Sequence, residues 1–215
     1  SSSYSQCAGE DATVTICDIQ NPANQSINLF NLLGGSPSTG GVWVDNSKPI
    51  EESSFNGILN IQAIKNSGVY TYSYVQDPAT CLDNEATITL KIGPYAGVPS
   101  PNISICDDNE SLNLFQAFDG TQLAPQQNGY WIGNDTSLTL SGNKINPKLL
   151  GEGNYSYTYT VPALDICPEQ TATISVSIFR KPIAGIATDL VLCSSANLAS
   201  YSNLNLNDLL SGEDA

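Results

Sequence analysis

Histidine and methionine are absent from the 215 residues, and lysine and arginine together number only 7. Without histidine the chain cannot build a Ser-His-Asp triad, a Cys-His nucleophile pair or a histidine metal site. So few basic residues exclude a surface that neutralises a row of phosphates, and we expect no nucleic-acid partner. Long apolar runs are also missing, so the sequence predicts no insertion into a membrane.

The side chains that remain for acid–base catalysis are mainly carboxylates. The chain has 21 Asp and Glu and a net charge of −14. The pairs Glu51-Glu52 and Asp107-Asp108 have the chemistry of glycosidase acids, but neither recurs and both flank turn-like sequence. We therefore predict no catalytic residues and no enzyme activity. Oxygen ligands for calcium gather at 107–110, but the spacing of a calcium-binding loop is missing, so we expect no metal and no cofactor.

What the chain has in abundance is internal repetition. Ala8-Gly9 returns as Ala96-Gly97 and Ala184-Gly185, and an alternating run into cysteine follows each, at Cys17, Cys106 and Cys193. The other matched segments are Ser26–Phe30 with Ser111–Phe115, Trp43 with Trp131, Tyr70/Tyr72/Tyr74 with Tyr155/Tyr157/Tyr159, and Ala86–Ile92 with Ala172–Ile178. We predict two complete repeats, 8–93 and 94–182, and the opening part of a truncated third repeat, 183–215.

The periodicity within each repeat is two, which is typical of half-buried antiparallel strands. Ala86, Ile88, Leu90 and Ile92 share one face of their run, and turn signals such as Asn56-Gly57 separate such runs. About six or seven short strands per repeat predict an all-β fold of tandem immunoglobulin-like Greek-key β-sandwiches. The short joints with Pro94 and Pro182 favour beads on a string in a semi-rigid rod.

The aromatic landmarks occur in the order of an immunoglobulin-type sandwich, which has a core Trp on strand C and a corner Tyr on strand F. Trp43 with Tyr70, and Trp131 with Tyr155, fit those two places. Tyr72 and Tyr157 stand where an antibody domain has its second core cysteine. We expect all six side chains to mark the two cores. The alternative is that the tyrosine strands form a platform for glycans.

This order of motifs resembles the immunoglobulin-like and polycystic-kidney-disease-type repeats of large Bacteroidetes cell-surface proteins, including gliding-motility-associated adhesins. The resemblance covers nearly the whole chain. It implies secretion, a bacterial cell-surface location, and a non-catalytic stalk or adhesin role. The expected partners are neighbouring repeats of the same long chain, and surface polysaccharide or another cell-surface protein. The alternative function is an accessory carbohydrate-binding region of a large secreted hydrolase.

Six cysteines at wide spacing predict disulfides and an oxidising compartment. Pairing within repeats gives Cys17–Cys81 and Cys106–Cys167, with Cys7 and Cys193 unpaired. The alternative, Cys7–Cys17, Cys81–Cys106 and Cys167–Cys193, uses all six and cross-links the repeats. We adopt the first scheme, because Cys7 has no counterpart in the second repeat.

The adopted scheme carries a geometric conflict. If the six-residue run ending at Cys17 is a strand, it places Cys17 up to about 20 Å from the turn that holds Cys81, whereas disulfide-bonded Cα atoms lie within about 7 Å. Either this run is mostly linker or the pairing crosses repeats. We expect the linker.

Overall fold

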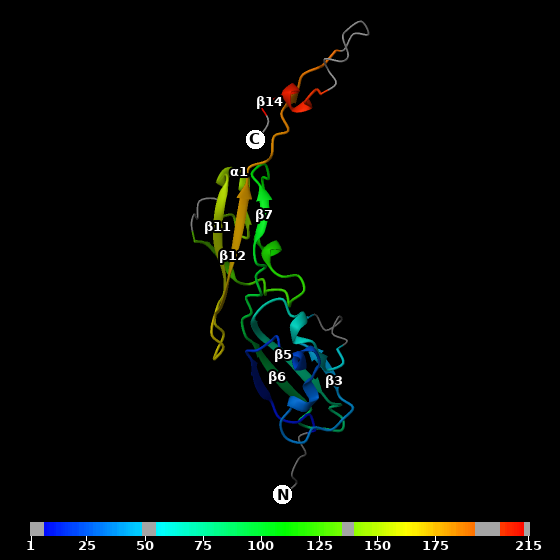
Figure 1. Ribbon diagram of the computed structural model, residues 1–215. Helices are drawn as coiled ribbons and strands as arrows, with labels where there is room; N and C mark the ends of the chain where they lie inside the picture. The colour runs from blue at the N-terminus through cyan, green and yellow to red at the C-terminus, as the bar shows by residue number, and fades with distance from the viewer. Residues whose placement is uncertain (1–6, 49–54, 135–139, 192–202, 213–215) are drawn as a thin grey trace.

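The computed structural model describes residues 7–48, 55–134, 140–191 and 203–212. It contains two β-sandwiches that follow one another along an elongated molecule (Figure 1). The first sandwich comprises β1 to β6 and the second comprises β7 to β12. The chain is therefore all-β and immunoglobulin-like, as the alternation of its apolar residues predicted.

The first sandwich has one four-stranded sheet in the order β1-β6-β5-β3. Strand β1 runs parallel to β6, and β5 pairs antiparallel with both β6 and β3. A short pair, β2 with β4, faces this sheet. The strand bounds are Ala12–Ile16 for β1, Ile27–Asn28 for β2, Val42–Asp45 for β3, Ile58–Leu59 for β4, Gly68–Val75 for β5 and Glu85–Ile92 for β6.

The second sandwich repeats this topology, with the sheet β7-β12-β11-β9 and the facing pair β8 with β10. Its strand bounds are Ile103–Cys106 for β7, Leu112–Asn113 for β8, Tyr130–Gly133 for β9, Lys144–Ile145 for β10, Gly153–Val161 for β11 and Gln170–Phe179 for β12. The four-residue helix α1 (Pro147–Leu150) follows β10. In both sandwiches the last strand is central and hydrogen-bonds on both sides.

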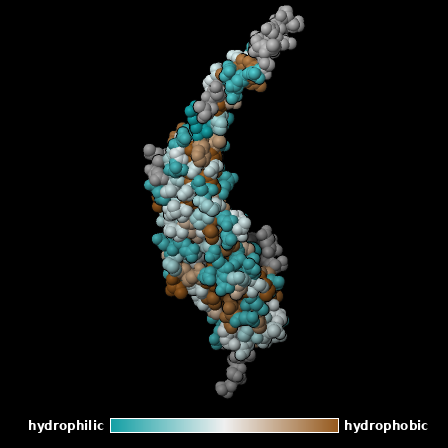
Figure 2. Space-filling model, in the orientation of Figure 1, coloured by the Kyte–Doolittle hydropathy of each residue, from teal (hydrophilic) through white to brown (hydrophobic). Residues whose placement is uncertain are grey.

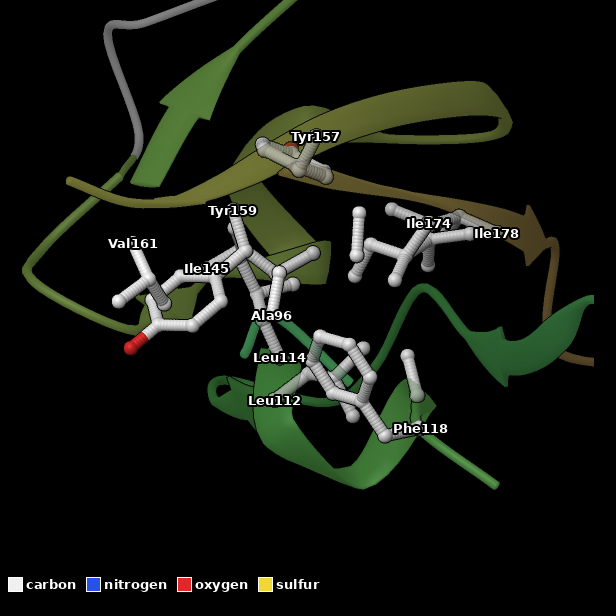
Figure 3. Packing of buried hydrophobic residues seen from close by; sticks show 13 residues of the cluster. Ala96, Leu112, Leu114, Phe118, Ile145, Tyr157, Tyr159, Val161, Ile174 and Ile178 are labelled. Carbon is white, nitrogen blue, oxygen red and sulfur yellow. The ribbon is translucent and has the colours of Figure 1, made fainter. Parts of the chain in front are cut away.

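Each sandwich encloses its own hydrophobic core. Strand β6 turns Ala86, Ile88, Leu90 and Ile92 inward, and each is at most 1% exposed. Figure 3 shows the second core, where Ile174 and Ile178 of β12 face Leu112, Leu114 and Phe118 across the sandwich. Burial of one face of an otherwise polar strand is the main driving force for each sandwich.

The expected core markers lie on the inner faces. Trp43, Tyr72 and Tyr157 are buried, whereas Tyr70, Tyr155 and Trp131 are half-buried and pack against the two cores. The Tyr70 hydroxyl donates to the Asn66 carbonyl at 2.9 Å, and the Tyr155 hydroxyl to that of Leu150 at 2.8 Å. A tyrosine that bonds backbone a few residues upstream is the tyrosine corner of immunoglobulin-like sandwiches.

A recurrent asparagine cap explains the repeated Asn-Leu motif. The side-chain oxygens of Asn28 and Asn113 each accept from the backbone N–H two residues later, at 3.0 Å, and start the 3-10 helices η2 (Leu29–Leu32) and η5 (Leu114–Ala117). Asn205 makes the same bond, at 3.1 Å, at the start of η7 (Leu206–Leu209). After η7, β14 (Leu210–Ser211) pairs with β13 (Ile186–Ala187).

Hydrophilic residues and residues of intermediate hydropathy cover most of the face seen in Figure 2, and hydrophobic residues lie among them. No helix within the described ranges is long and apolar enough to cross a membrane.

Candidate functional site: the cross-linked joint and the aromatic groove

Two disulfides join the chain in a pattern that the sequence did not predict. Cys7 pairs with Cys81 within the first sandwich, with Cα atoms 6.0 Å apart. Cys17 pairs with Cys167 of the second sandwich, with Cα atoms 5.2 Å apart. Cys106 forms no disulfide, and Cys193 lies outside the described residues. The sandwiches are therefore covalently linked to each other beyond the peptide chain.

The predicted pairs Cys17–Cys81 and Cys106–Cys167 are wrong, because the run before Cys17 is a strand and not a linker. Strand β1 lies parallel to β6 with Ile16 opposite Ile92. Cys17 therefore reaches the end of the sheet nearest the second sandwich, while the β5–β6 turn with Cys81 lies at the other end. Cys7 precedes β1 at that other end, and the neighbouring Ala8 N–H bonds the Asp83 carbonyl at 3.4 Å. The alternative scheme, which began with Cys7–Cys17, is also wrong. It did correctly predict that a disulfide joins the two repeats.

The β11–β12 turn brings Cys167 to the first sandwich. Leu164 and Cys167 exchange two backbone hydrogen bonds, at 3.0 and 2.9 Å, across a tight turn in which Asp165 has a φ of 53°. Figure 1 shows this turn extending from β11 and β12 toward the first sandwich. Asp165 thereby contacts Thr15 of β1 and Lys91 of β6, and the disulfide attaches the turn to Cys17, directly after β1.

An ion pair accompanies the disulfide. The Lys91 ammonium of β6 donates to the Asp165 carboxylate at 2.9 Å, and the Thr15 hydroxyl of β1 bonds the same oxygen at 3.4 Å. The hydrogen bond from Lys91 is the main reason that the pKa of Asp165 lies below its usual value, and desolvation of the carboxylate opposes this shift. The pair is partly solvated, so it orients the turn more than it stabilises the joint.

Gly93 leaves the space that the cross-link occupies. It follows β6 directly and is buried next to Cys17, bonding the Ile16 carbonyl at 2.8 Å. A Cβ atom at this position would lie 2.8 Å from the sulfur of Cys167 and 3.0 Å from the Cα of Cys17. Both contacts are too close for a side chain, so the disulfide requires glycine here.

A buried amide fixes the chain where it passes from one core to the other. Tyr95 packs in the first core and Ala96 in the second. Gln126, which is 1% exposed, accepts from the Tyr95 N–H at 2.9 Å and donates to the Gly93 carbonyl at 3.0 Å. Its own backbone N–H bonds the Tyr95 carbonyl at 3.0 Å. These bonds satisfy backbone groups that no strand pairs, as buried polar groups require.

The segment after Gln126 extends this contact to the first sandwich. Gln127 N–H donates to the Lys65 carbonyl at 2.8 Å. The Asn128 side chain accepts from the Ser67 N–H at 3.1 Å and donates to the Ser67 carbonyl at 3.0 Å. We call this set of contacts, together with the disulfide, Gly93 and Asp165, the joint. It restrains the two sandwiches from two separate loops.

An aromatic groove of about 730 Å³ opens on the second sandwich, beside the edge strand β9. Trp131 and Tyr130 line it together with the amide side chains of Asn113, Asn143 and Gln127. Asn143 donates to Asn113 at 3.0 Å. The indole N–H of Trp131 is buried and finds no acceptor among the described residues. Aromatic rings beside amides give a surface that can stack and hydrogen-bond at once.

In the first sandwich, Gly57 and Phe55 pack against Trp43 at the position equivalent to the groove. Gly57 there occupies the position of Asn143, since their carbonyls accept from Leu29 and Leu114, respectively. A Cβ at Gly57 would lie 2.4 Å from the indole nitrogen of Trp43. Phe55 also packs edge-on against Trp43, with ring centroids 6.5 Å apart. Trp43 is consequently buried, so among the described residues of the first sandwich its ring does not line a groove as Trp131 does.

The acidic cluster at 107–110 is engaged in ion pairs. Asp108 lies 2.7 Å from the Lys181 ammonium, and Glu110 lies 2.9 Å from that of Lys148. Asp107 accepts from the Lys181 N–H at 3.0 Å. Among the described residues, no three acidic or cysteine side chains gather as a metal site would require. The other carboxylate pair, Glu51-Glu52, lies outside the described residues.

Comparisons with known proteins give no family. No family profile and no curated protein matches the chain. Among solved structures, Sidekick-1 immunoglobulin domains 1-4 align over 84% of this chain and 52% of theirs, with 16% identity and a TM-score of 0.29. Human mucin-like protocadherin EC1-2 aligns over 80% of this chain and 97% of its own, with 11% identity and a TM-score of 0.27.

Drosophila OTK extracellular domains 3-5 give a TM-score of 0.23 at 14% identity, over 67% of this chain and 53% of theirs. The chain thus spans about half the length of the Sidekick-1 and OTK fragments. The immunoglobulin-like fold stands on the strand order and registers of this chain.

Proposed function

We propose that this chain is a non-catalytic stalk or adhesin segment of a large secreted protein at a bacterial cell surface. The observation that carries the proposal is the disulfide between Cys17 and Cys167, which links successive sandwiches covalently. Such a link is not needed for either sandwich to fold. In a spacer, however, it fixes the direction from one domain to the next. The disulfides also favour an oxidising compartment outside the cytoplasm.

Charge and repetition support the same role. A net charge of −14 keeps neighbouring copies apart and limits non-specific attachment to acidic surfaces. The recurrence of the asparagine cap at Asn205 supports a third repeat in 183–215. The resemblance to gliding-motility-associated adhesins gives this proposal its bacterial setting and its expected partners, namely further repeats and a surface polysaccharide or protein.

Surface labelling of intact source cells tests the proposal. Antibodies raised against residues 1–215 should stain cells that have not been permeabilised, and external protease should remove the signal. The purified chain, added in excess, should reduce attachment of the cells to their surface or to one another. Staining that appears only after permeabilisation would contradict the proposal.

The aromatic groove favours a second candidate function, the accessory carbohydrate-binding region. Sugar rings stack on aromatic faces, and their hydroxyls pair with amides such as Asn113 and Asn143. Affinity electrophoresis in gels containing soluble xylan or β-glucan tests it. Retardation that Tyr130→Ala abolishes would support it. Val42→Ala, which changes the equivalent exposed residue of β3, is the matched control. Equal migration with and without polysaccharide would exclude binding of these two glycans.

A further inference from the structure

We propose that the disulfide Cys17–Cys167 carries a pulling force around both sandwiches, so that the chain transmits tension without unfolding them. The proposal rests on the stalk function above, because a chain held at both ends experiences such a force. Tension applied at the two ends follows the shortest covalent path. That path runs through β1 to Cys17, crosses to Cys167 and continues through β12.

Most of the fold lies off this path. The strands from β2 to β11 all fall between the two cysteines, which are 150 residues apart in sequence. That separation corresponds to about 500 Å of fully extended chain. As long as the disulfide is closed, no force applied at the ends can draw out this length, whether or not the two cores stay folded.

The two strands that remain on the path have little length to give. Tension enters β1 at one end and leaves at the other, and the same holds for β12, so the backbone of each strand carries the load itself. A strand already rises about 3.3 Å per residue, close to the limit of an extended chain. The hydrogen bonds of β1 to β6, and of β12 to β11 and β7, are therefore not the elements that resist the force.

The second disulfide, Cys7–Cys81, limits extension of the chain only when Cys17–Cys167 is open. Cys7 and Cys81 are 74 residues apart, and their loop overlaps that of Cys17 and Cys167. While Cys17–Cys167 is closed, the path from Cys7 to Cys17 is the shorter one, and Cys7–Cys81 locks nothing further. If Cys17–Cys167 is opened, Cys7–Cys81 still withholds about 250 Å of chain, most of the first sandwich.

Single-molecule force spectroscopy on the full chain, held by handles at both ends, tests the inference. Cys106→Ser and Cys193→Ser form the background, so that no other thiol can pair. We expect the oxidised chain to extend without unfolding steps from either sandwich. A phosphine reductant added under load should release about 500 Å of further contour length. Oxidised chains that unfold as fully as reduced ones would overturn the inference.

Paired variants separate the two disulfides. Cys7→Ser with Cys81→Ser should leave the locked length at about 500 Å, and Cys17→Ser with Cys167→Ser should lower it to about 250 Å. The inference would also be overturned if the locked length were shorter without Cys7–Cys81 than without Cys17–Cys167. If a variant does not fold, reduction of the background chain still supplies the measurement. The force measurement uses the purified chain, so a negative surface-labelling result would not change the force result. A negative force result would likewise not change the result of surface labelling.

Discussion

Single residues at the joint act through small size or complete hydrogen bonding. Gly93 has no side chain where one would strike the disulfide, and Gln126 uses both ends of its amide on backbone groups. Tyr72 does not belong to the joint. Its ring packs in the first core, and burial raises the pKa of its hydroxyl group. Each of these roles predicts the effect of a substitution.

Replacing Gly93 with alanine should hinder closure of the Cys17–Cys167 disulfide. The added methyl would lie 2.8 Å from the Cys167 sulfur, and overpacking of this kind costs about 1–3 kcal/mol. Thiol labelling should therefore find a larger reduced fraction at Cys17 and Cys167 after refolding in a glutathione buffer. Gly120→Ala is the control, because a Cβ there meets nothing within 4 Å. Equal labelling of both variants would refute the role of Gly93.

The stability of the first sandwich should fall at alkaline pH because of Tyr72. Burial, with smaller contributions from Asp45 and Tyr70, raises the pKa of Tyr72 from 10.0 to about 12. The unfolded chain therefore loses this proton at lower pH than the folded chain does. The stabilisation is complete below pH 10 and is lost as pH rises toward about 12.

Denaturant unfolding at about pH 9 and about pH 11.5 measures this loss. Tyr72→Phe keeps the ring and should have a smaller loss of free energy of unfolding between the two pH values than the unmodified chain. An equal loss in both proteins would show that other groups control the alkaline transition.

At the scale of elements, two loops of the second sandwich extend back to the first. The β11–β12 turn contributes Asp165 and Cys167, and the segment between η5 and β9 contributes Gln126 and Asn128. These loops are separated by three strands of the second sandwich, so the joint is held at two points. One loop alone would allow rotation about its contact.

Gln126→Ala should destabilise the joint without removing either core. It would leave the Tyr95 N–H and the Gly93 carbonyl buried without their side-chain partner, at a cost of about 1–3 kcal/mol for each group. Thermal unfolding should show a lower Tm than that of the unmodified chain. Gln122→Ala changes an exposed amide in the same segment and should leave Tm unchanged. A Tm for Gln126→Ala equal to that of Gln122→Ala would exclude a structural role for the buried amide.

The sequence predicted the strands better than the joint, for physical reasons. Alternation in 86–92 and 172–178 reflects one buried face, so it identifies strands and their inner residues directly. The joint depends on contacts between distant segments with no periodicity, and Gln126 sits in a polar run that resembles an ordinary loop. One signal was available for the cysteines. Thr13 and Thr15 alternate with apolar residues, which identifies β1 and places Cys17 away from Cys81.

At the scale of the whole molecule, the disulfides make two small sandwiches into one covalently closed unit. A loop of 150 residues would stabilise the folded state by about 5 kcal/mol in the chain-entropy model, although the overlapping loop reduces this figure. The elongated arrangement in Figure 1 and the charge of −14 suit a spacer held away from its neighbours.

Peptide mapping without reductant tests the cross-link between the sandwiches most directly. Trypsin separates the peptides that carry Cys81, Cys106, Cys167 and Cys193, and further cleavage after Glu10 separates Cys7 from Cys17. The structure predicts a disulfide-linked peptide that joins Cys17 to Cys167, and a second that joins Cys7 to Cys81. A peptide that joins Cys17 to Cys81, or Cys106 to Cys167, would contradict the covalent joint.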